Sequence, residues 1–230
     1  MPEEIILSSK SEDFFNFENC IKTMNCITNP VTEKIVVDIN AKNRWFLFNF
    51  GMLFAYLHYF PNKKIVSAKK IERTPYKSFE NVLISIIEKI QPLQNYKINQ
   101  KKAFIISPVR ETQDKITNYL RYYKSKLLEK NFEMVHLPID DTNQMDPIGI
   151  NICRNNLEAA ASSGTIKVFY QKNSLGSVFD LGMIFMLKYY IDLKIYPNEK
   201  RKIEIINPFN LSNGNYEKFL LQLTKRIGKT

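Results

Sequence analysis

Hydrophobic and polar positions follow two patterns along this chain. Short apolar runs rich in β-branched residues indicate strands, and longer stretches with apolar residues three or four positions apart indicate helices. The expected strands are 5–9, 33–39, 102–108, 133–138, 165–171 and 202–207. The expected helices are 12–24, 44–60, 78–90, 111–130, one around 155–160, one within 173–187, and 215–226. From residue 102 onward strands and helices alternate, which predicts an α/β domain with a parallel sheet and helices on both faces.

The chain is organised around one strand, turn and helix. After the strand 165–171, small residues at Ser174, Gly176 and Ser177 form a turn that leads into an apolar helix. A helix N-terminus collects free N–H groups and the positive end of the helix dipole, so it suits an anion such as phosphate. Asp180 is expected in the first turn of this helix, either as a functional carboxylate or as an ordinary helix-start residue stabilised by the dipole.

A second set of polar residues follows the strand 102–108. Ser107 ends this strand, and Arg110 comes shortly after it. In open α/β sheets, ligands bind at the carboxyl ends of the strands, which makes both residues candidates for substrate binding. Arg110 is equally compatible with an ordinary surface cation.

The loop 139–150 carries three aspartates, Asp140, Asp141 and Asp146. They do not follow the order of a calcium-binding loop, so no metal site is expected from them. Asp146 has two interpretations. It is either a residue of the site or a turn former that caps the helix around 155–160.

The first part of the chain repeats the second. An offset of 131 residues places Gly51 on Gly182 and aligns the apolar helix 44–60 and the strand before it with their counterparts. Asp180 then aligns with Asn49, which cannot act as a carboxylate, and 174–176 aligns with the bulky 43–45. We therefore expect residues 1–95 to be a reduced, diverged copy that lacks the site, joined by a polar linker at 91–102 to a domain at 103–230. The alternative is chance similarity between two apolar helices.

Composition narrows the class of protein. The net charge is +10, of which the part from residue 99 onward holds +7 (20 basic against 13 acidic residues). This suits an anionic partner, although a lysine-rich solvated surface explains it as well, and no RNA-binding signature is present, so nucleic acid is not expected. Three cysteines without a C-x-x-C pair, and two histidines, predict reduced thiols and no zinc site. The longest apolar run is too short for a membrane span and no signal peptide is visible, which favours the cytoplasm.

The spacing of Ser174-Leu175-Gly176 before Asp180-Leu181-Gly182 resembles the signature of the nucleoside 2-deoxyribosyltransferase superfamily, nearest to its nucleoside 5′-monophosphate N-glycosidases. The resemblance covers residues 103 to about 208 and implies a Rossmann/flavodoxin-like sheet, with no cofactor and no metal. It makes Asp180 the nucleophile, where the family usually has Glu. It makes Asp146, in D-P-I-G-I, the residue on the nucleobase side that assists proton transfer. The substrate-binding positions that follow are Ser107, Arg110, Ser174, Gly176 and Ser177.

The activity implied is cleavage of the N-glycosidic bond of a nucleotide or nucleoside. The alternative is a catalytically silent nucleotide sensor or partner-binding module. Members of the family are commonly homodimers whose pockets a neighbouring subunit completes. We therefore expect residues 1–95 to pack on the second domain as a built-in partner, in a pseudo-dimer within one chain. The rival arrangement is a free-standing N-terminal domain with ordinary two-fold dimers of the second.

Overall fold

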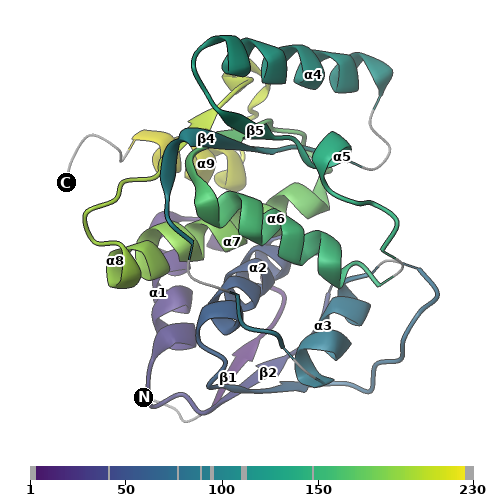
Figure 1. Cartoon of the computed structure of the whole chain (residues 1–230). Coiled ribbons are helices and arrows are strands. Elements are labelled where there is room, and N and C mark those ends of the chain that lie inside the picture. The colour runs from purple at the N-terminus through teal and green to yellow at the C-terminus, as the bar shows by residue number, and fades with distance from the viewer. Residues whose placement is uncertain are drawn as a thin grey trace.

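The computed structural model describes residues 4–225 except 41, 77, 89, 94–95, 110–112 and 147, and leaves the side chains of Glu12, Phe209 and Lys225 undescribed. Within this part of the chain lie two parallel sheets flanked by helices, which is consistent with a Rossmann/flavodoxin-like fold (Figure 1).

The first sheet has the strand order β1-β2-β3. Its strands are β1 (Glu4–Leu7), β2 (Lys34–Val37) and β3 (Lys64–Ser67), and its helices are η1 (Glu12–Phe14), α1 (Phe17–Thr28), α2 (Arg44–Tyr59) and α3 (Phe79–Glu88). The expected helix 12–24 was misplaced. The side chain of Asn16 accepts a hydrogen bond from the amide of Asn19 at 2.8 Å, so α1 begins after this cap and continues four residues further.

The second sheet has the order β5-β4-β6-β7, formed by β4 (Asn99–Ile106), β5 (Met134–His136), β6 (Ser163–Val168) and β7 (Lys202–Ile205). Its longer helices are α4 (Asp114–Glu129), α6 (Ile150–Ser162), α7 (Leu175–Met186) and α9 (Asn215–Lys225). The short ones are α5 (Pro138–Asp141), η2 (Leu187–Ile191), α8 (Asp192–Ile195) and η3 (Pro208–Asn210). Because β4 begins at Asn99, the expected linker 91–102 is too long by four residues, which belong to the strand.

The elements form layers, with the main core between the two sheets (Figure 1). We call the part of the chain with β1 to β3 the first half and the part with β4 to β7 the second half. One cluster of buried apolar side chains contains residues of both halves, including the buried apolar residues of α2 and α7. A smaller cluster lies under α4 and contains Leu120, Leu127 and Val135. Helices thus cover both faces of the second sheet, as expected for an α/β domain.

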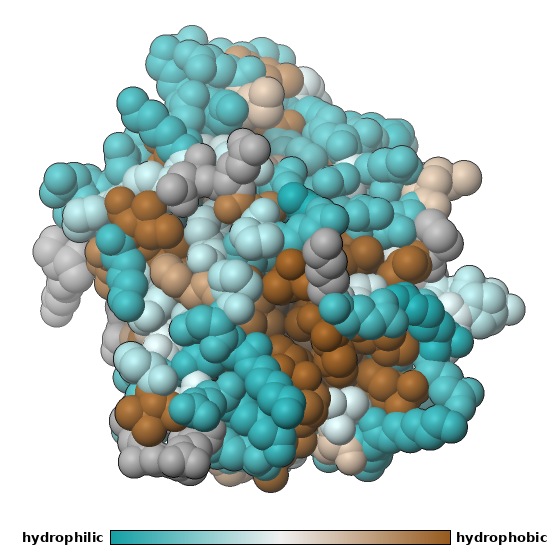
Figure 2. Space-filling view, turned by 60° about the horizontal axis from the view of Figure 1, so that its bottom comes forward, coloured by the Kyte–Doolittle hydropathy of each residue, from teal (hydrophilic) through white to brown (hydrophobic). Residues whose placement is uncertain are grey.

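The first sheet differs from this expectation. Its strands follow one another in a single direction, and successive right-handed crossovers then place their helices on the same face. Ile6, Val36 and Val66 are paired neighbours on the opposite face, and Ile6 is 63% exposed. Figure 2 turns this side of the molecule forward and shows apolar side chains gathered on it.

Helices α2 and α7 join the two halves through a reciprocal contact. A Cβ on Gly51 would lie 2.1 Å from the carbonyl oxygen of Phe179, and a Cβ on Gly182 would lie 2.0 Å from the carbonyl oxygen of Phe48. Only glycine allows the two backbones to approach so closely. The four residues form two pairs at the offset of 131, so each helix uses the same positions against the other.

The two halves also share strand order and register. Ile5, Ile35 and Ile65 are partners across β1-β2-β3, as Phe104, Ile166 and Ile203 are across β4-β6-β7. Helix α1 of the first half packs against α9 of the second, and α3 of the first half packs against α6 of the second. Since α1 corresponds to α6 and α3 to α9, the two contacts are equivalent. The second half has α4, β5 and α5 in addition. The part that both halves share is therefore a unit of three parallel strands, with reciprocal helix contacts between the halves.

Candidate functional site

A cavity of about 560 Å³ opens between the two halves at the carboxyl ends of the strands. Its walls come from the residues after β4 and β6, the N-terminal parts of α6 and α7, and the first turn of α3. This volume is typical of small-molecule sites. Ser107, Ser174, Gly176 and Asp180, four of the residues expected from the sequence, line this one cavity.

Asp180 lies deeper in its helix than expected. Because α7 begins at Leu175, Asp180 falls in the second turn, and the expectation of a first-turn residue was wrong. The stabilising effect of the helix dipole fades beyond the first turn, so the helix-start interpretation no longer explains this carboxylate. Its side chain lines the cavity but is only 6% exposed. Burial raises the pKa of Asp180 to about 7, and a hydrogen bond from Asn156 opposes that rise.

A row of hydrogen bonds connects Asp180 to strand β5. The Nδ2 of Asn156 donates to Oδ2 of Asp180 at 3.2 Å, and the hydroxyl of Thr142 donates to Oδ1 of Asn156 at 2.8 Å. The Thr142 oxygen lies 2.8 Å from Nε2 of His136, which therefore carries the proton as donor. Burial lowers the pKa of His136, which favours the neutral ring. The row fixes the Asn156 amide so that its N–H groups point to the carboxylate.

The turn before α7 combines an open space with two hydroxyls. A Cβ on Gly176 would meet no heavy atom of the described residues within 4 Å, so the cavity extends to the helix N-terminus. Ser174 and Ser177 are 2.7 Å apart, hydroxyl to hydroxyl. Ser177 is buried and does not line the cavity, so it holds Ser174 rather than facing a ligand. The N-terminal amides of α7 and the Ser174 hydroxyl together suit a phosphate group.

Asp146 has the second of its two expected roles. Its carboxylate accepts from the amide of Ile148 at 3.1 Å and from the amide of Asn151, in the first turn of α6, at 2.8 Å. Close to it in the chain, Gly149 adopts a φ of 89°, a conformation that favours glycine, and lines the cavity. Asp146 itself does not line the cavity, so it shapes the start of α6. Arg110 lies outside the described residues.

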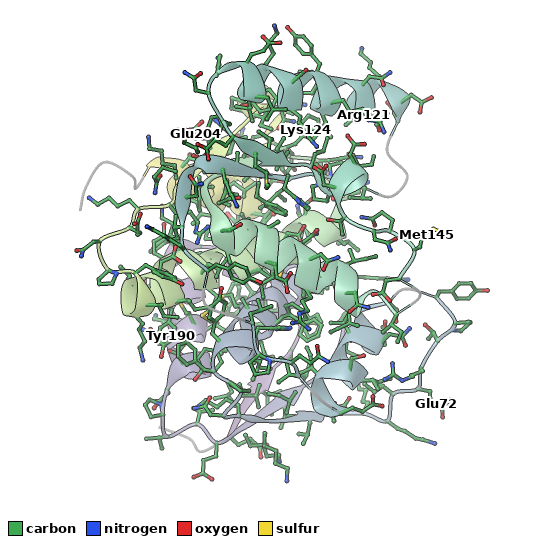
Figure 3. The ribbon with its side chains drawn as sticks, viewed as in Figure 1. Glu72, Arg121, Lys124, Met145, Tyr190 and Glu204 are labelled. Carbon is green, nitrogen blue, oxygen red and sulfur yellow. The ribbon has the colours of Figure 1, made fainter. Side chains whose placement is uncertain are left out.

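The other two aspartates of the loop form ion pairs with α4. Arg121 binds Asp140 at 2.8 Å and Lys124 binds Asp141 at 2.6 Å (Figure 3). Asp141 also accepts from the amide of Leu137 and so caps α5. These contacts hold α5 under α4.

Sequence reasoning missed two groups that line the cavity. Glu80 and Phe79, in the first turn of α3, come from the half that was expected to carry no site. Asn156, the partner of Asp180, was considered only as part of a helix. No local motif marks these residues, because their role depends on how the two halves pack.

A second hollow, of about 570 Å³, lies at the opposite ends of β2 and β3. It is open, three of its lining residues are lysines, and the amine of Lys63 donates to the carbonyl oxygens of Asn29 and Thr32. Ligands of open α/β sheets bind at the carboxyl ends of strands, so the cavity beside Asp180 is the better candidate site.

The described residues contain no cluster of three or more histidine, cysteine or acidic side chains able to hold a metal ion. In the same part of the chain, no helix combines the length and apolar character needed to cross a bilayer. Cys20, Cys26 and Cys153 form no disulfide bond with one another. Comparison with known proteins finds no family model, no curated protein and no solved structure that matches this chain.

Proposed function

We propose that this protein cleaves the N-glycosidic bond of a nucleotide or related nucleoside, with Asp180 as the nucleophile. An oxygen of Asp180 attacks C1′ of the sugar while the C1′–N bond breaks and its electron pair leaves with the base. Water then attacks C1′ of the resulting ester and releases the sugar and the carboxylate. A second base in place of water would complete a transfer reaction instead.

The observation that carries this proposal is the setting of Asp180. A buried carboxylate faces a cavity of nucleotide size, one helix turn from an N-terminus suited to phosphate. Burial strips water from the carboxylate and makes it a stronger nucleophile once it is ionised. The Asn156 amide fixes one of its oxygens at 3.2 Å and leaves the other for attack. Positioning of this kind supplies a large share of the rate in such reactions.

Departure of the base needs a proton at the leaving nitrogen. The family resemblance assigns this step to Asp146, but both oxygens of Asp146 accept hydrogen bonds, one from the amide of Ile148 and the other from the amide of Asn151 in α6. We therefore propose that Asp146 acts through position, by holding Gly149 and the α6 wall against the base, and that the leaving nitrogen takes its proton from solvent water in the open cavity. Replacing Asp146 with Asn keeps an acceptor for the cap and removes the acid. Loss of base release in a folded Asp146→Asn protein would restore its assignment as the proton donor.

We also propose that the two halves arose by duplication of one α/β unit. The shared strand order, the shared register and the reciprocal glycine contacts support a common origin. In this proposal the first half acts as a built-in partner, since α3 contributes a wall of the cavity.

One observation favours a second candidate function, a nucleotide-binding sensor. With a pKa of about 7, roughly half of the Asp180 carboxyls are protonated at neutral pH and cannot attack. The two functions are separated by incubating the protein with 5′-monophosphates and deoxynucleosides and measuring free base by chromatography. Thermal-shift measurements run with the same compounds. Binding with release of base supports the glycosidase, and binding without release at pH 6, 7 and 8 supports the sensor.

A further inference from the structure

The first half corresponds to the second, with α2 matching α7 and α3 matching α9. This correspondence gives the cavity a counterpart elsewhere in the molecule. The cavity lies between the start of α7 and the start of α3, so the counterpart lies between the start of α2 and the start of α9. Arg44 corresponds to Leu175 at the offset of 131. For α3 and α9, the last helix of each half, the matching offset is 137. This offset aligns the buried Leu83 and Ile86 of α3 with the buried Leu220 and Leu223 of α9.

This alignment of α3 with α9 places Phe79 on Tyr216 and Glu80 on Glu217. Both pairs keep their chemistry, an aromatic ring followed by a carboxylate in the first turn of the helix. Phe79 and Glu80 line the open cavity, whereas Tyr216 and Glu217 are 5% and 1% exposed.

The counterpart is filled by the chain itself. The guanidinium of Arg44 lies 4.9 Å from the centre of the Tyr216 ring, and its Nη1 lies 3.4 Å from Oε1 of Glu217. The hydroxyl of Tyr170 donates to the same carboxylate. Burial alone would raise the pKa of Glu217, but the bond from Tyr170 and the charge of Arg44 outweigh it and lower that pKa. A planar group with several N–H donors thus stacks on the ring and pairs with the carboxylate.

We propose that Phe79 and Glu80 recognise a nucleobase in the same manner, and that the base is guanine. This rests on the proposed function of the cavity as a nucleotide site. Phe79 is a fixed platform, because its ring packs on Phe179 at 5.1 Å between centroids. Guanine presents N1–H and the 2-amino group side by side, matching two carboxylate oxygens as a guanidinium does.

The other bases lack this edge. Hypoxanthine has N1–H without the amino group. Adenine and cytosine place one amino group beside an acceptor nitrogen, and uracil places one N–H between two carbonyls. A carboxylate facing a ring acceptor or a carbonyl oxygen is repelled. A site built to pair with a donor rejects an analogue that lacks it, because its own polar group is left unpaired.

The test is titration calorimetry with guanosine, inosine and adenosine 5′-monophosphates on the whole chain. We expect the unmodified protein to bind the guanosine nucleotide about 10- to 100-fold more tightly than the inosine nucleotide, the range that one charge-assisted hydrogen bond supplies. Glu80→Gln should reduce that ratio to near one. Glu72→Gln is the matched control, since Glu72 pairs with Lys70 on the surface, away from the cavity (Figure 3), and should keep the ratio.

A replacement variant and a measurement of base release complete the test. If Glu80→Gln fails to fold, Glu80→Asp takes its place and should give an intermediate ratio. An unchanged ratio in the folded variant, an equal affinity of the unmodified protein for all three nucleotides, or binding of none of them overturns the inference. Base release is measured on the same samples. A Glu80-dependent preference without release removes the glycosidase and keeps this inference, and release without the preference does the reverse.

Discussion

Replacing Asp180 with asparagine should stabilise the protein at alkaline pH. The carboxyl titrates near its ordinary pKa of 3.8 in the unfolded chain and near 7 in the folded one, because burial disfavours its charge. The folded state therefore holds this proton more tightly, and stability is lost as the pH rises from about 4 to about 7. Asparagine keeps the shape and a partner for Asn156 but has no charge to bury.

The magnitude follows from the two pKa values. Each unit of difference is worth about 1.4 kcal/mol. Ionisation of Asp180 then costs the folded state about 2 kcal/mol at pH 5, where only the unfolded chain is ionised, and about 4 kcal/mol at pH 8, where both states are. Asp180→Asn should accordingly gain about 2 to 3 kcal/mol relative to the unmodified protein between these two pH values.

Urea unfolding gives the free energy of unfolding of both proteins at pH 5 and pH 8. The gain is the amount by which the difference between Asp180→Asn and the unmodified protein grows from pH 5 to pH 8. Asp114→Asn, an exposed residue at the start of α4, provides the matched control and should differ from the unmodified protein by the same amount at both pH values. If unmodified protein and Asp180→Asn lose stability in parallel from pH 5 to pH 8, the carboxyl is not desolvated and the argument for its role fails.

Three further predictions concern the packing of the halves and the site. Gly182→Ala should cost about 3 kcal/mol or more in urea unfolding, because its Cβ meets the backbone of Phe48, while Gly176→Ala should cost nearly nothing; equal effects would contradict the close approach. Asn156→Leu should leave Asp180 without its buried partner, raise its pKa further and shift the acid limb of the pH–rate profile upward; an unmoved limb would show that the bond is not made. Residues 99–230 expressed alone should aggregate, because α7 would lose its cover, and a soluble, active fragment would refute the built-in partner.

The sequence predicted the elements of this fold well where a long apolar run marks them. The apolar stretch 44–60 is the buried helix α2, and its paired offset with α7 was visible from Gly51 and Gly182. The boundaries were less accurate. The polar residues 99–101 resemble a linker, but they form the start of β4, because the backbone hydrogen bonds of a strand require no apolar side chains.

The candidate site was predictable only in part, for a physical reason. Ser107 and Ser174 follow strands of one sheet, and Gly176 and Asp180 lie in the first two turns of the helix after one of these strands, so their convergence follows from local order. Glu80 reaches the cavity through contacts between the halves, which no local pattern encodes. For Asp146 the sequence allowed two interpretations, because a carboxylate before a helix fits both a catalytic motif and a helix cap. The hydrogen bond from the amide of Asn151 shows that it caps α6.

Release of free base as a function of pH tests the central claim most directly. On the 5′-monophosphate that binds most tightly, we expect kcat/KM of the unmodified protein to rise about tenfold per pH unit below 7 and to level above it, as the Asp180 carboxyl ionises. Asp180→Asn should bind the same nucleotide and release no base. Mass spectrometry of the unmodified protein quenched during turnover should show one sugar phosphate esterified to Asp180. Base release by Asp180→Asn at the unmodified rate, with the same pH profile, would contradict the assignment of this carboxylate as the nucleophile.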